Sequence, residues 1–176
     1  MTFRPFALGA AAAVALAGIA PAGAALAQPG DPPPGPEFVR MAGASDKFEI
    51  TEAQIAQTRS HDPRVRDFAK MMVRDHTKST MKVKAAARRV MGHNPPPPML
   101  RPDQQQKVAD LRAAHGPDFD RTYLDQQVAA HQEALDLMQG YARGGDAPPL
   151  RHAAEEIAPV VQHHLEMARD LQSHAR

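Results

Sequence analysis

Met71-Met72-Val73-Arg74-Asp75-His76 lies in the middle of a long helical pattern and places a histidine where the pattern requires an apolar side chain. With a turn of about 100° per residue, the apolar side chains between residues 65 and 90 form one stripe. The members of this stripe are Val65, Phe68, Ala69, Met72, Val83, Ala86, Ala87 and Val90. His76 falls at its centre. Because burial of an imidazole among apolar groups costs free energy unless a partner compensates it, the partner of His76 is the central question.

The helical period recurs along the chain, and turn signals separate the segments that carry it. We predict long helices over residues 37–59, 63–91 and 118–143, a fourth that begins at Pro148, and a short helix over 103–114. No stretch alternates with a period of two over the length of a strand. Four amphipathic helices, with one short extra helix in the crossing between the second and the third, predict an all-α four-helix bundle.

Local residues set the expected helix ends. Asp62 is the predicted N-cap of the second helix, Pro63 its first residue, and Gly92 its left-handed C-terminal residue. Pro159 lies on the face opposite the apolar stripe of the last helix, so we expect a kink toward water and not a break.

The first 27 residues have the pattern of a secretory signal peptide. Arg4 is the only charged residue before Asp31, an apolar run covers residues 6–20, and Ala25 and Ala27 are the small residues before a cleavage site. We therefore predict a signal peptide over 1–27, a Pro-rich tether over 28–36 and a bundle domain over 37–174, exported to a bacterial periplasm. An uncleaved anchor is the alternative, although the apolar run is shorter than the ~18 residues that a membrane span needs.

Composition excludes several classes of function. Removing residues 1–27 takes away one of the 21 Lys and Arg residues and none of the 20 Asp and Glu residues, so the mature chain is formally neutral. A neutral chain has no global electrostatic signature of nucleic-acid binding. The absence of cysteine excludes disulfides, thiolate metal sites and cysteine nucleophiles.

Polar side chains recur inside the apolar stripes of the other helices. His131 and His164 occupy such positions, as do Glu49 and Glu52 on the first helix. Counted from the connecting turns, Glu49 fits the depth of the histidines better than Glu52 does. Imidazole and carboxylate groups that converge from four helices suit a divalent transition metal such as Zn, Cu or Fe. The predicted metal ligands are Glu49, His76, His131 and His164, with Asp75 and Glu52 as orienting partners or alternative ligands.

Other interpretations of the same residues stay open. A metal-free belt, in which each histidine is hydrogen-bonded to a carboxylate, an amide or a hydroxyl, explains the pattern equally well. The many methionines would suit copper, although methionine more often fills gaps in a core. The Glu-x-x-His pair of di-iron proteins is missing, since Val73 and Val161 stand three residues before His76 and His164. No nucleophile elbow, P-loop or dinucleotide motif is present, so no catalytic residue is predicted.

A set of ordered motifs spans residues 37 to 174. They are Phe48-Glu49-Ile50, Ile55-Ala56, Phe68-Ala69-Lys70-Met71-Met72-Val73-Arg74-Asp75-His76, Phe119-Asp120-Arg121-Thr122-Tyr123-Leu124, Val128-Ala129-Ala130-His131 and His163-His164-Leu165. Together they resemble the domain-of-unknown-function family 4142. The resemblance implies a ferritin-like bundle and an exported bacterial protein, often described as a predicted outer-membrane or periplasmic protein. It implies no established activity. It matches Glu49, Asp75, His76, His131 and His164 to the family's characteristic polar positions.

Three functional hypotheses follow. The first is an exported, non-enzymatic bundle whose interior His/Glu cluster binds a divalent transition metal. The second is a metal-free structural or stress-related envelope protein with protein partners that the sequence does not identify. The third is a metal-dependent enzyme, which would need an open coordination position and a pocket that reaches solvent.

Overall fold

The computed structural model describes residues 31–174, and this part of the chain is helical throughout apart from its connections. Its helices are α1 (Gly35–Arg59), α2 (Pro63–Met91), α3 (Pro102–Ala113), α4 (Pro117–Gly144) and α5 (Pro148–His174). The predicted all-α bundle with one short extra helix is therefore confirmed. None of the described helices is long and apolar enough to cross a membrane.

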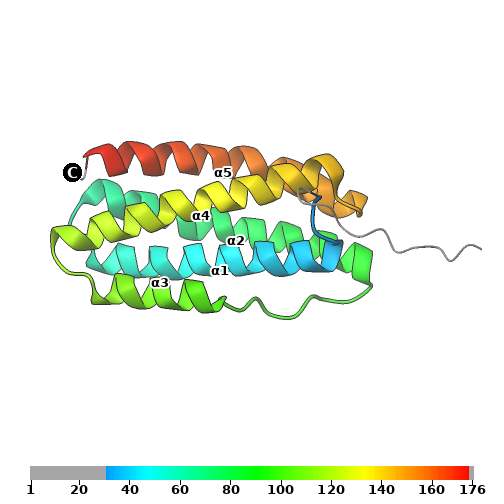
Figure 1. Ribbon diagram of the computed structural model, residues 1–176, viewed down its shortest axis with the longest axis horizontal. Coiled ribbons are helices and arrows are strands. Elements are labelled where there is room, and N and C mark those ends of the chain that lie inside the picture. Colours follow the sequence, from blue (N-terminus) through cyan, green and yellow to red (C-terminus); the bar gives the residue numbers. More distant parts are fainter. Residues whose placement is uncertain (1–30, 175–176) are drawn as a thin grey trace, which may run out of the picture.

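The four long helices form the bundle, and each packs against two neighbours that run in the opposite direction (Figure 1). α1 packs on α2 and α4, and α5 packs on the same two helices. Because α2 and α4 run in the same direction, the chain must return along the bundle between them. The proline-rich segment 92–101 and α3 make this return, and α3 lies against α1 and α4 (Figure 1). The long crossing is the topology of ferritin-like bundles.

The ends of α2 follow the local sequence. Asp62 Oδ1 accepts a hydrogen bond from the backbone N–H of Arg64 at 2.8 Å, and Pro63 is the first helical residue. Gly92 ends the helix with a φ of 74°, a conformation that is strained for residues with a Cβ atom. Both predicted ends are confirmed. The cap residues of α2 therefore determine how far His76 lies from each end of the helix.

α1 begins at Gly35, two residues before its predicted start, so Gly35 and Pro36 belong to the helix and not to the predicted tether. The N–H of Gly35 donates to Asp146 Oδ2 at 3.3 Å, and Tyr141 Oη donates to Asp146 Oδ1 at 2.7 Å. Asp146 thereby ties the start of α1 to the turn between α4 and α5. The predicted signal peptide and residues 28–30 of the predicted tether lie outside the described residues.

Two further positions test the helical pattern. α5 continues without a break through Pro159, which is exposed, as its position opposite the apolar stripe predicts. The prediction that Val90 belongs to the buried stripe of α2 is wrong, because this side chain is 40% exposed. It lies in the last turn of α2, where the neighbouring Met91 packs against the core instead.

A layer of buried polar side chains divides the core of the bundle. An apolar cluster that includes Phe38 and Leu150 lies on one side of this polar layer, and a cluster that includes Phe68 and Tyr123 lies on the other. All four long helices contribute to the polar layer, whose members are Asp46, Glu49, Glu52, His76, Ser79, Gln127, His131 and His164. Because buried polar groups are unfavourable unless they are paired, this polar layer is the candidate ligand site.

Glu52 is the member of the polar layer paired with an amide. Gln127 Nε2 donates to Glu52 Oε2 at 3.0 Å, whereas Oε1 is buried without a partner. Burial raises the pKa of the Glu52 carboxyl from 4.5 to about 8, although the hydrogen bond from Gln127 acts in the opposite direction. The folded protein therefore keeps this proton at neutral pH, whereas the unfolded chain releases it near the ordinary pKa of a glutamate.

We predict that Glu52→Gln removes a pH dependence of stability between pH 4.5 and about 8. In this range the folded state binds one proton more than the unfolded state. The contribution of Glu52 to the free energy of unfolding of the wild type therefore falls as pH rises, by at most about 1.4 kcal/mol per pH unit. The variant, whose amide does not titrate, should match the wild type near the lower limit and exceed its stability by up to about 4 kcal/mol at the upper one. Urea denaturation across this range measures the difference.

The matched control is Glu155→Gln, which makes the same change from carboxyl to amide in a side chain that is 58% exposed. It should leave the pH profile of the wild type unchanged. Equal slopes for Glu52→Gln and the wild type would contradict a buried, protonated Glu52.

Candidate metal centre

His76, His131 and His164 meet at the centre of the polar layer, from α2, α4 and α5. Their ring centroids lie 5.3 Å (His76–His131), 5.4 Å (His76–His164) and 5.6 Å (His131–His164) apart. One ring nitrogen of each lies within 4.8 Å of the corresponding nitrogens of the other two. All three side chains are buried. The three predicted histidines are thus brought together, and we call them the histidine triad.

His76 is held through both of its ring nitrogens. Its Nδ1 lies 2.9 Å from Asp46 Oδ1 in a hydrogen bond, and Glu49 Oε2 is 2.7 Å from the same nitrogen. A carboxylate only accepts hydrogen bonds, so Nδ1 carries the proton. Its Nε2 faces His131 Nε2 at 3.3 Å. The two carboxylates therefore turn Nε2 of His76 toward the rest of the triad.

His131 is oriented by its own helix. Its Nδ1 lies 2.8 Å from the backbone oxygen of Gln127, one turn earlier, and this oxygen can only accept. In neutral His131 the Nε2 atom is consequently an acceptor, and it faces Nε2 of His76. Two acceptors cannot bond to each other, so a proton or another cation must lie between these two atoms. In the metal-free protein that proton belongs to His76.

His164 has one ring nitrogen beside a carboxylate and the other without a partner. Its Nε2 lies 3.4 Å from Asp75 Oδ2, while its Nδ1 is buried and makes no hydrogen bond. Asp75 is itself held by Arg74 Nη2 at 2.7 Å and by Lys78 Nζ at 3.4 Å. The predicted orienting partner Asp75 thus lies beside His164. An unpartnered buried imidazole nitrogen is the donor atom that a metal ligand requires.

Glu49, predicted as a fourth ligand, lies beside the histidine triad and not within it. It forms a second close group with Asp46 and His76, whose ligand atoms lie within 4.8 Å of one another. Glu49 Oε1 is 3.6 Å from His131 Nδ1, so both of its oxygens face the nitrogens on the far side of the triad. Glu52, the alternative ligand, is paired with Gln127 and belongs to neither group.

Asp46 is the site residue that the sequence analysis missed. It is 3% exposed, and it accepts hydrogen bonds from His76 and from Thr80, whose Oγ1 lies 2.9 Å from Asp46 Oδ2. The sequence does contain one indication of its role. Asp46 precedes Glu49 by three residues, and Glu49 precedes Glu52 by three. Residues at this spacing share one side of a helix.

The charges of the polar layer are strongly coupled. Burial alone would lower the pKa of His76, but the nearby Glu49 and Asp46 outweigh it and raise that pKa to about 10. Burial lowers the pKa of His164 to about 3, and positive charge on His76 and His131 adds to this effect. Burial likewise lowers the pKa of His131. The metal-free centre at neutral pH therefore contains one imidazolium and two neutral imidazoles.

The donor set fits a transition-metal ion. Three imidazoles are a common set for zinc, copper and iron, and each ring has an acceptor at its other nitrogen. Such acceptors fix the tautomer and the orientation of a metal-binding histidine. Among the described residues, the histidine triad and the group of Asp46, Glu49 and His76 are the clusters with metal-ligand spacing.

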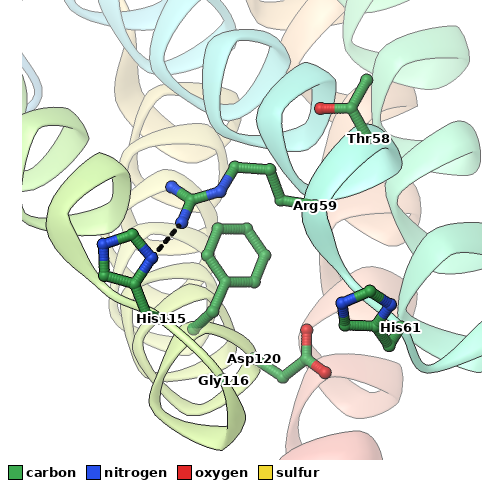
Figure 2. A pocket seen from close by; sticks show the side chains of 7 residues that line it. Thr58, Arg59, His61, His115, Gly116 and Asp120 are labelled. Carbon is green, nitrogen blue, oxygen red and sulfur yellow. Dashed lines mark hydrogen bonds between the residues drawn. The ribbon is translucent and has the colours of Figure 1, made fainter.

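Two surface pockets lie away from the histidine triad. One lies at the end of the bundle, where Arg59 donates to His115 Nδ1 at 3.2 Å, with His61 and Asp120 across the pocket (Figure 2). Arg59 also donates to backbone oxygens at the end of α3, so this region holds α3 to α1. The other is a groove between α2 and α5 that includes Met71 and Met167. No histidine of the triad lines either pocket.

Solved structures with the same fold include three forms of one protein, CopM. CopM in the Cu(II)-bound form is 15% identical with a TM-score of 0.71, and the match covers 82% of this chain and 99% of that chain. The Cu(I)-bound form is 16% identical with a TM-score of 0.67, and the match covers 80% of this chain and 96% of that chain. The silver-bound form obtained by co-crystallization is 17% identical with a TM-score of 0.66, and the match covers 80% of this chain and 96% of that chain. At this level of identity the likeness shows the bundle fold alone.

A search of curated proteins found no match. The profile of the family described as "Domain of unknown function (DUF4142)" matches residues 20–171, which include all five helices up to Leu171. This range covers most of the sequence and confirms the resemblance drawn from its motifs. The chain belongs to the DUF4142 family.

Proposed function

We propose that this protein is an exported, non-enzymatic metal-binding bundle whose histidine triad holds one divalent transition-metal ion. The observation that carries the proposal is the pairing of the rings. His76, His131 and His164 each have one nitrogen beside an acceptor, namely Asp46, the Gln127 carbonyl and Asp75. The remaining nitrogens are the donors for a metal.

The spacing of these donors supports the proposal. Metal–nitrogen bonds of about 2.0–2.1 Å in tetrahedral geometry place two ligand nitrogens about 3.3–3.4 Å apart. His76 Nε2 and His131 Nε2 lie 3.3 Å apart. The pair therefore needs little movement to exchange its shared proton for a metal ion.

The comparison with CopM supports a metal-binding role in a bundle of this fold. Its solved forms include the Cu(II)-, Cu(I)- and silver-bound states. Imidazole donors suit zinc, copper and iron, and the affinity of a given site is highest for copper among the divalent ions. The signal-peptide pattern of residues 1–27 supports a function outside the cytoplasm, in the periplasm of a bacterium.

A metal-free structural protein is the second candidate, and one observation favours it. His76 and His131 already have protein partners at both ring nitrogens, since their Nε2 atoms share a proton. In that case the polar layer aligns the helices and takes part in no binding.

We predict that His164→Ala abolishes metal-dependent stabilisation, whereas His163→Ala retains it. His163 is the matched control because it is the neighbouring histidine and is exposed. At a free metal concentration of 100 times Kd, binding stabilises the wild type by about 2.7 kcal/mol. For a chain of this size, that corresponds to a rise in Tm of roughly 5–10 °C. Differential scanning calorimetry with zinc and copper(II), together with elemental analysis of protein purified from the periplasm, measures it.

An equal metal-dependent rise in Tm in the wild type and in both variants would show that the metal binds at another site. No rise in the wild type would favour the second candidate, the metal-free structural protein.

We predict that the effect of added metal on the stability of His131→Ala distinguishes the two candidate functions. The substitution leaves His76 Nε2 without a partner and removes the imidazole beside Glu49 Oε1, so it should destabilise the metal-free protein by about 2–4 kcal/mol. If the triad binds metal, the wild type gains further stability from added metal and the variant does not. If the layer is only structural, urea denaturation should give the same loss at every metal concentration.

A further inference from the structure

Two carboxylates face the same nitrogen of His76. Asp46 and Glu49 lie about one turn apart on α1, and both are buried, with 3% and 0% exposure. Asp46 Oδ1 is 2.9 Å and Glu49 Oε2 is 2.7 Å from His76 Nδ1. A single N–H cannot compensate two carboxylates, so this part of the polar layer holds an excess of negative charge whenever both are ionised.

No lysine or arginine among the described residues forms an ion pair with either carboxylate. The charged partners of Asp46 and Glu49 are histidines, and Thr80 adds one hydroxyl to Asp46. Asp75 differs, because Arg74 and Lys78 balance it at the surface. Since an uncompensated buried charge is strongly unfavourable, Asp46 and Glu49 require positive charge inside the bundle.

The charge that they require matches a divalent ion. When the three imidazoles are neutral ligands, the only formal charges of the centre are those of the metal and of the two carboxylates. An ion of charge +2 makes this sum zero, whereas an ion of charge +1 leaves one negative charge buried. The donors of the two clusters are imidazole nitrogens and carboxylate oxygens, whereas a soft monovalent ion favours sulfur donors.

We propose that Asp46 and Glu49 make the histidine triad selective for divalent over monovalent metal ions. The inference rests on the proposed metal-binding function and assigns Asp46 and Glu49 as its specificity-determining residues, which act through His76 and need not contact the metal. Zn(II) and Cu(II) are then the cargo class of the site, and Cu(I) and Ag(I) are disfavoured because they leave one negative charge uncompensated, as the proton of the metal-free centre does. CopM, by contrast, has been solved with copper in both oxidation states and with silver.

The test compares Zn(II) with Ag(I), two ions that undergo no redox change, by competition titration in chloride-free buffer. The wild type should bind Zn(II) more tightly than Ag(I). Asp46→Asn and Glu49→Gln should each weaken Zn(II) binding by about 10- to 100-fold, a usual effect of removing the partner of a metal-binding histidine. Ag(I) binding should stay the same or become tighter, so the ratio of the two dissociation constants falls.

Thr80→Val is the matched control, because it removes the hydroxyl that holds Asp46 but changes no charge. It should keep the Zn(II)/Ag(I) ratio of the wild type even if it weakens both ions. The ratio is measured within one folded protein, so a loss of stability in any variant does not change its meaning. The two single carboxylate variants are independent tests if one of them does not fold.

The outcomes separate the inference from the function on which it rests. A wild type that binds Ag(I) as tightly as Zn(II), or a ratio that neither carboxylate variant changes, overturns the selectivity and leaves metal binding in place. A wild type that binds neither ion at one equivalent overturns the proposed function itself.

Discussion

The polar layer depends on the ion pair between His76 and the carboxylates of Asp46 and Glu49. This interaction joins α1 to α2 in the middle of the bundle, and Nε2 of the same imidazole extends it to His131 on α4. Apolar clusters on both sides exclude water, so the attraction acts in a medium of low dielectric constant. The same low dielectric constant makes each member costly to remove, because its partner would stay buried and uncompensated.

The scaffold supports such a centre because every member lies on a long helix. His76, His131 and His164 are far from the helix ends, and each is oriented by a neighbour at its second nitrogen. In the proposed metal site, rigid elements and such supporting contacts would hold the ligands close to a productive geometry before an ion binds. The pocket at the end of the bundle differs, because there Arg59 is used to attach α3 to α1.

The sequence predicted the fold closely because helical periodicity and end signals are local. Asp62, Pro63 and Gly92 act within one turn of their own position, so the ends of α2 were predictable. The three histidines were predictable for the same reason, since each interrupts an apolar stripe. Asp46 was missed although it is three residues from Glu49, because spacing shows only that the two share one side of the helix and does not show its partners His76 and Thr80. Val90 shows the opposite case, in which a residue of the stripe is exposed while the next residue, Met91, packs against the core.

The sequence by itself determined four amphipathic helices, a long proline-rich crossing, and one inward histidine on each of α2, α4 and α5. Periodicity alone decides which side of a helix is buried, and this needs no knowledge of its neighbours. Only the tertiary structure decided that Glu49 lies behind His76, beside Asp46, and outside the histidine triad. The relative depth of the helices and the rotation of each side chain decide which ring nitrogen meets which oxygen. These quantities are set by packing between segments that are distant in the sequence.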